Sequence, residues 1–139
     1  MASRRESWLR LVMRVVGTGG LLAFPCALMP ESWMNAIHEF LGMGPLPSEP
    51  IVGYLARSTS LFYAGLGGLL WGLSNSPGSY RALIRYVGGA VFLFGLLLFA
   101  IDHGEGLPRW WWLFEGPFSM AYGAVILVLS SRLGPDREV

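Results

Sequence analysis

Four long apolar runs constrain this chain more than any other feature. They cover residues 11–29, 51–73, 83–101 and 110–129. Each is close to the roughly 20 residues that an α-helix needs to cross the hydrocarbon core of a bilayer. In lipid the backbone must satisfy its own hydrogen bonds, which a helix does and an open strand does not. None of the runs alternates strictly, as a membrane β-barrel strand does. The sequence therefore predicts an all-α integral membrane four-helix bundle.

The composition agrees with this prediction. Hydrophobic residues make up 53% of the 139-residue chain and charged residues 14%, against about 25% charged in a typical soluble domain. The mean hydropathy is +0.50. The net charge of +1 gives no reason to expect a nucleic-acid partner. A single cysteine excludes an intramolecular disulfide. We expect a single transmembrane domain over residues 1–139.

The charges of the connections predict an orientation. The arginines that precede or open the first span, separate the second from the third, or follow the fourth are Arg4, Arg5, Arg10, Arg14, Arg81, Arg85, Arg132 and Arg137. The other two connections hold only Arg109. Positively charged connections stay in the cytoplasm, so both termini are expected there. The acids expected on the outer side are Glu31, Glu39, Glu49, Asp102 and Glu105.

The first outer connection is expected to contain a short amphipathic helix over residues 32–41. Trp33, Ile37, Phe40 and Leu41 are spaced as one apolar face of a helix. Ser32 is expected to cap its start, and Gly42 to end it. Such a helix lies on the bundle or among the lipid head groups.

Small residues are expected to set the helix packing, because they let helices approach closely in lipid. Ala64, Gly68 and Gly72 repeat every four residues in the second span. Gly17 and Gly20 are the small residues of the first span, and Gly88, Gly89 and Gly95 those of the third. Pro25 and Pro117 are expected to kink the first and fourth spans.

Arg57 and Glu115 are opposite charges placed inside spans. Arg57 lies six residues into the second span, and Glu115 about as far into the fourth. At 1.5 Å per residue both are ~9 Å below the outer ends of their helices. A lone charge in a span is costly and finds a partner in the bundle interior. We therefore expect Arg57 and Glu115 to face each other or to share a polar cluster.

Two main interpretations of this cluster remain open. One is a buried ion pair that fixes helix register, with separate snorkelling of each residue to the surface as a minor variant. The other is an outer-leaflet polar pocket that receives a ligand head group, in which Arg57 holds an anionic or carbonyl group. The candidate ligand-binding residues are Arg57, Glu115, Asp102, His38, Tyr54 and Trp112.

The tryptophans at residues 110–112 are expected to anchor the fourth span in the outer interface, with one ring turned inward. No residue set has recognisable catalytic spacing, and no metal site or cofactor is expected. The sequence favours a non-catalytic accessory subunit or a binder of a lipid or other hydrophobic small molecule. The alternative is a small isomerase-like membrane enzyme, with Glu115 or Asp102 as acid or base. Other expected partners are membrane lipids and a homo-oligomer or larger membrane complex.

The stretch "YLARSTSLFYAGLGGLLWGL", from Tyr54 to Leu73, places an arginine before a glycine-rich apolar face. With "YRALIRYVGGAVFLFGLLL" in the third span, it resembles the small bacterial DoxX-like membrane proteins. The resemblance covers mainly the second and third spans. It implies a multi-pass four-helix bundle in a bacterial inner membrane, and some relatives are accessory subunits of quinone-linked oxidoreductase systems. It carries over no catalytic residues.

Overall fold

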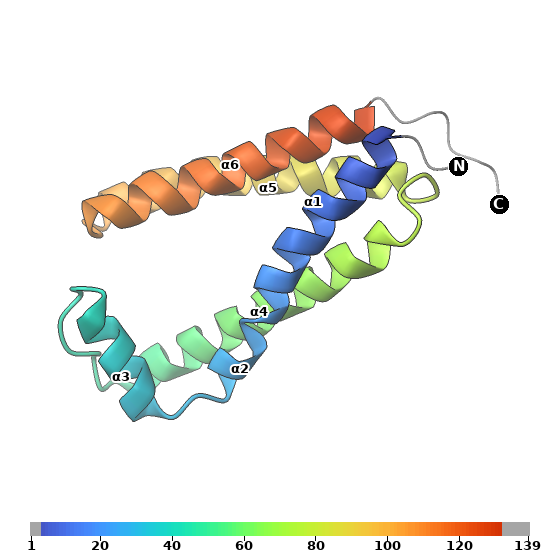
Figure 1. Ribbon diagram of the computed structural model, residues 1–139. Helices are drawn as coiled ribbons and strands as arrows, with labels where there is room; N and C mark the ends of the chain where they lie inside the picture. The colour runs from blue at the N-terminus through green and yellow to red at the C-terminus, as the bar shows by residue number, and fades with distance from the viewer. Residues whose placement is uncertain (1–3, 132–139) are drawn as a thin grey trace. The chain divides into compact units, whose positions relative to one another are not determined.

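The computed structural model of the chain describes residues 4–131, which are helical and contain no strand in that range. The helices are α1 (Arg4–Leu21), α2 (Phe24–Ala27), α3 (Glu31–Phe40), α4 (Pro50–Ser74), α5 (Arg81–Gly104) and α6 (Arg109–Ser131), as Figure 1 shows. The all-α prediction is confirmed. Arg132 and Arg137, which entered the orientation argument, lie outside the described residues.

The first apolar run is divided into two helices. α1 begins at Arg4, well before the apolar residues, and ends at Leu21. α2 then starts at Phe24 and carries Pro25 in its first turn. Proline has no backbone N–H and is best tolerated in the first turn of a helix, which is where Pro25 lies in α2. The kink expected at Pro25 is therefore a break between two helices.

α3 is the amphipathic helix expected between the first and second apolar runs. It begins after Pro30, and its N-terminus has no side-chain cap, so the prediction that Ser32 caps it was wrong. Gly42 follows its end with a φ of 78°, the left-handed conformation that commonly ends a helix. On its apolar face the Trp33 side chain is 65% exposed and Phe40 89%. This face is not covered by the protein.

The described residues pack as two compact units. The first, here called the cavity unit, is Arg14–Trp71; the second, the hairpin unit, is the rest of the described chain. α1 and α4 each contribute residues to both units.

In the hairpin unit, α5 and α6 run antiparallel and side by side (Figure 1). Glycines spaced seven residues apart on both helices form the seam between them: Gly88 and Gly95 on α5, Gly116 and Gly123 on α6. A Cβ added to Gly95 would lie 2.6 Å from the backbone nitrogen of Met120. The two backbones therefore touch, and no larger residue fits the seam without moving a helix.

In the cavity unit, α1 and α4 meet through glycines in the same way. A Cβ on Gly67 would lie 2.5 Å from the Gly17 carbonyl oxygen, and one on Gly20 would lie 2.7 Å from the Tyr63 carbonyl oxygen. Beside this contact, Trp71 Nε1 donates a hydrogen bond to Thr18 Oγ1 at 3.2 Å. Gly68, expected to be part of the contact face, has no atom closer than 3.9 Å to an added Cβ. The face used is therefore centred on Gly67.

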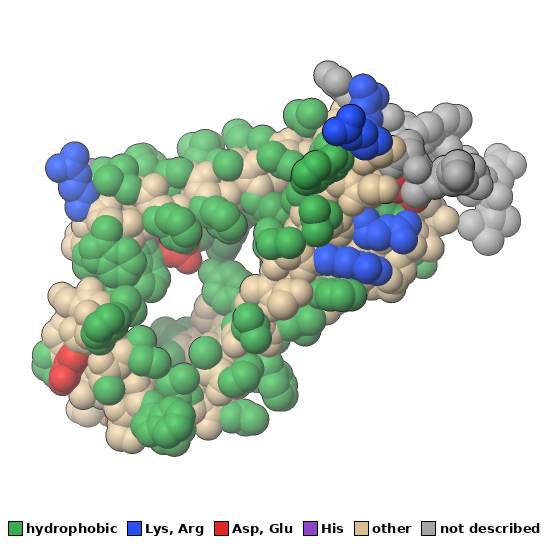
Figure 2. Space-filling model, viewed as in Figure 1, with side chains coloured by type: hydrophobic (Ala, Val, Ile, Leu, Met, Phe, Trp, Pro, Cys, Tyr) green, Lys and Arg blue, Asp and Glu red, His purple; other side chains and the backbone are tan. Residues whose placement is uncertain are grey.

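Among residues 4–131, three helical segments are long and apolar enough to cross a membrane: Arg4–Ala27, Arg81–Gly104 and Arg109–Ser131. α4 has 25 residues but is not one of them. The polar run at residues 57–60 lowers its hydropathy. In the view of Figure 2, where α6 lies in front of α5, hydrophobic side chains predominate along the length of α6. This distribution is typical of helices surrounded by lipid.

Candidate functional site

Arg57 is held in place by backbone carbonyl groups. Its Nη1 donates to the carbonyl oxygen of Gly53, one turn earlier in α4, at 3.5 Å. Its Nη2 donates at 3.2 Å to the carbonyl oxygen of Met29, which lies between α2 and α3. A Cβ on Gly53 would come within 3.0 Å of Arg57 Nη1. The missing side chain at Gly53 therefore gives the guanidinium room to fold back along its own helix.

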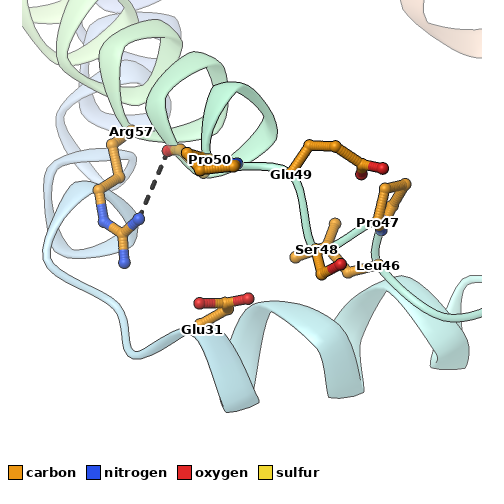
Figure 3. A pocket seen from close by; sticks show the side chains of 8 residues that line it. Glu31, Leu46, Pro47, Ser48, Glu49, Pro50 and Arg57 are labelled. Carbon is orange, nitrogen blue, oxygen red and sulfur yellow. Dashed lines mark hydrogen bonds between the residues drawn. The ribbon is translucent and has the colours of Figure 1, made fainter.

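A cavity of about 110 Å³ opens beside this guanidinium (Figure 3). It lies wholly within the cavity unit, between the start of α3, the start of α4 and the loop that joins them. The lining residues are Glu31, Leu46, Pro47, Ser48, Glu49, Pro50, Gly53 and Arg57. Five of the eight, Leu46 to Pro50, form the "LPSEP" stretch, which therefore builds most of the wall.

The loop that forms this wall is fastened to α3. Nδ1 of His38 donates a hydrogen bond to the carbonyl oxygen of Gly44, and the two atoms are 2.7 Å apart. Asn35 Oδ1 accepts the backbone N–H of Leu46 at 2.7 Å. Gly44 has a φ of 77°, which other residues rarely adopt. These contacts hold the loop against α3 at Gly44 and Leu46, and so fix the position from which the lining residues continue.

The charges around the cavity are unequal. Arg57 is the one basic residue among the lining side chains, and Glu31 and Glu49 are the acidic ones. Within the cavity unit Arg57 forms no ion pair, because no carboxylate oxygen comes within 4.0 Å of its nitrogens. The guanidinium has five N–H donors, and the two carbonyl groups do not use them all. The remaining donors are available to a ligand.

The hairpin unit contains the other charged candidates. Asp102 is 4% exposed, near the end of α5, and its Oδ2 has no hydrogen-bond partner among the described residues. Trp112 packs edge-on against the rings of Phe99 and His103, with centroids 5.4 Å and 5.3 Å away. Glu115 accepts a hydrogen bond from Trp111 Nε1, one turn earlier in α6. Trp111 thus gives the Glu115 carboxylate a local partner.

The six predicted site residues are divided between the units. Arg57, His38 and Tyr54 belong to the cavity unit, and Glu115, Asp102 and Trp112 to the hairpin unit. Of the first three, only Arg57 lines the cavity. His38 positions the loop, and Tyr54 is 65% exposed. The expected pairing of Arg57 with Glu115 joins residues of different units and stays a prediction.

Sequence reasoning missed several lining residues. Glu31 and Glu49 were recognised as outer acids but were not assigned to the site, and Ser48 and Gly53 were not considered. These residues could have been found from their closeness to Arg57 in the sequence. Gly53 lies one turn before it, and the "PSEP" stretch leads into the same helix.

Comparison with protein-family models, with curated proteins and with solved structures finds no match for this chain. The resemblance to DoxX-like proteins therefore remains an expectation from the sequence.

Proposed function

We propose that this protein is a non-catalytic, multi-pass membrane protein that binds the polar head of an amphipathic molecule in the Arg57 cavity. The observation that carries the proposal is an arginine with unused donors that faces a cavity and has no ion pair within its unit. A structural arginine is normally satisfied by a carboxylate. A guanidinium that is bonded only to two carbonyl groups and keeps unused donors beside open volume supports binding of an anionic or carbonyl group.

The proposal includes α4 as a fourth spanning helix. The hydroxyl of Ser58 donates to the carbonyl oxygen of Leu55, and that of Ser60 to the carbonyl oxygen of Ala56. Hydroxyl groups that bond to their own helix leave no unsatisfied polar atom in lipid. Phe62 on the same helix is 81% exposed, which lipid accommodates and water does not favour. An even number of spans puts both termini on one side of the membrane, and the arginines of the connections favour the cytoplasmic side. The DoxX-like resemblance supports a bacterial inner membrane.

The outer connection supports access from the membrane surface. α3 leaves its apolar face, with Trp33 and Phe40, exposed, as a helix embedded among lipid head groups does. Glu31, at the start of this helix, lines the cavity. In this arrangement the cavity opens at the level where lipid head groups lie.

Native mass spectrometry of the protein purified in mild detergent tests the proposal. We expect a co-purifying small molecule bound to the wild type and lost in Arg57→Gln. The matched control is Arg85→Gln, which removes the same charge from an exposed position on α5 outside the cavity. Equal retention in both variants, with unchanged helix content, would contradict the proposal.

A further inference from the structure

The cavity wall carries more negative than positive charge, and this limits what can bind there. Arg57 attracts an anion, but Glu31 and Glu49 line the same cavity. A purely anionic head group would gain one favourable contact and face two carboxylates, which repel it. A ligand with one anionic and one cationic group satisfies both kinds of wall. We infer that the cavity recognises a zwitterionic head group, with its phosphate at Arg57 and a primary ammonium at Glu31, in the negative field to which Glu49 also contributes.

The positions of the side chains fit such a head group. In Figure 3 Arg57 enters the cavity from α4, and the Glu31 carboxylate points into it from the start of α3. Ser48 and Glu49 lie on the side away from Arg57. Glu31 on α3 faces Arg57 on α4, and the Glu49 carboxylate points away from both. The anionic end of the ligand would contact α4, and the cationic end would contact the start of α3. The Ser48 hydroxyl lines the same cavity and can both donate and accept a hydrogen bond.

The size of the cavity also fits. A volume of about 110 Å³ is several times the roughly 10–15 Å³ that a cavity needs to hold one water. The cavity therefore has room for a small polar group beside the guanidinium.

The lining residues discriminate between kinds of ammonium. Proteins bind quaternary ammonium groups with cages of aromatic rings, and none of the eight lining residues is aromatic. Carboxylates instead accept hydrogen bonds from N–H groups, which a primary ammonium has and a quaternary one lacks. The chemistry therefore favours an ethanolamine-type head group over a choline-type one. This inference rests on the proposed binding function of the Arg57 cavity.

The test measures lipid adducts by native mass spectrometry. The full-length protein is reconstituted into nanodiscs with equal amounts of phosphatidylethanolamine, phosphatidylcholine and phosphatidylglycerol that share the same acyl chains. We expect about a tenfold excess of the ethanolamine adduct over the choline adduct, the difference that one charge-assisted hydrogen bond gives. Arg57→Gln should lose all three adducts. Glu31→Gln and Glu49→Gln should keep binding but lose the preference for ethanolamine.

Glu105→Gln is the matched control, because Glu105 is an exposed outer acid that lies outside the cavity. It should leave the preference unchanged. If a glutamate variant has lost helix content, Ser48→Ala replaces it and should reduce the preference. Soluble glycerophosphoethanolamine is then added as a competitor. Displacement of the adduct would identify a free zwitterion as the ligand, and no displacement would identify the membrane lipid.

The outcomes separate this inference from the proposed function. Two results would overturn the zwitterion inference and leave the binding function intact, provided that the adducts still depend on Arg57. One is equal ethanolamine and choline adducts, and the other is a preference for phosphatidylglycerol. A preference for ethanolamine that survives both glutamate substitutions would also overturn it. If no lipid adduct of the wild type depends on Arg57, both the inference and the proposed function are overturned.

Discussion

Replacement of Gly123 by alanine tests the glycine seam of the hairpin unit. An added Cβ there would lie 2.5 Å from the backbone nitrogen of Phe92 and 2.6 Å from the Gly88 carbonyl oxygen. Ordinary contact begins at 3.4 Å, and backbone atoms cannot move aside singly. The shortfall from 3.4 to 2.5 Å means that α5 and α6 must separate by about 0.9 Å at this point.

This separation sets the expected magnitude. A gap of that size forfeits about a quarter to a half of the dispersion energy of the facing atoms. Overpacking costs about 1–3 kcal/mol, and alanine returns up to about 1 kcal/mol through its better helix propensity. We therefore expect Gly123→Ala to lower the free energy of unfolding by about 1–2 kcal/mol. The loss should appear in SDS titration of the protein in mixed micelles, followed by circular dichroism.

The matched control is Gly89→Ala on α5. An added Cβ at Gly89 meets nothing within 4 Å, so only the propensity gain remains and the variant should be as stable as the wild type or slightly more stable. The double variant Gly95→Ala and Gly123→Ala should lose less free energy of unfolding than the two single variants added together. The reason is that the first substitution has already separated the helices. The reasoning fails if Gly123→Ala and Gly89→Ala have the same stability.

Three further predictions concern other contacts. Gly67→Ala should destabilise the protein in the same SDS titration by about 1–3 kcal/mol, whereas Gly65→Ala, with open space around it, should not; equal midpoints would show that α1 and α4 do not touch there. Asp102→Ala should stabilise the protein by about 1–3 kcal/mol, since it removes a buried carboxylate whose Oδ2 has no partner; a lower unfolding free energy would mean that the carboxylate is satisfied in the membrane. His38→Ala should speed amide hydrogen exchange around Gly44 and weaken ligand retention, because the loop loses its tie to α3; unchanged exchange would show that the hydrogen bond does not hold the loop.

Much of the helical framework follows from hydropathy and proline. Apolar runs of spanning length became α5 and α6, since such runs satisfy their backbones only as helices. Pro25 separates α2 from α1 because it cannot donate to the preceding turn. Hydropathy did not identify the polar residues from Arg4 to Arg10 as part of α1, since a helix is set by its hydrogen bonds and not by where its residues become apolar.

The packing faces were harder to predict. A four-residue repeat suggested Gly68 as a contact, yet the neighbouring Gly67 faces α1. The seam between α5 and α6 instead follows a seven-residue spacing, with Gly116 and Gly123 on α6 matching Gly88 and Gly95 on α5. A period of seven is the signature of two helices that stay in contact over their length. The choice among glycines depends on the crossing of two helices, which one sequence segment does not specify.

The candidate site was predictable only at its centre. A charge inside an apolar run identified Arg57 without any structure. Its surroundings depend on a fold of the loop that requires Gly42 and Gly44 at positive φ and hydrogen bonds to Asn35 and His38. Those contacts bring Glu49 toward the start of α3, and no periodic pattern in the sequence encodes them.

A high-resolution structure of the protein crystallised from a lipidic mesophase tests the central claim most directly. The account predicts non-protein density in the cavity, with a polar atom within hydrogen-bond distance of the Arg57 guanidinium. A dry cavity, with Arg57 paired to Glu115, would contradict the proposed binding function. It would establish Arg57 as one member of a structural ion pair.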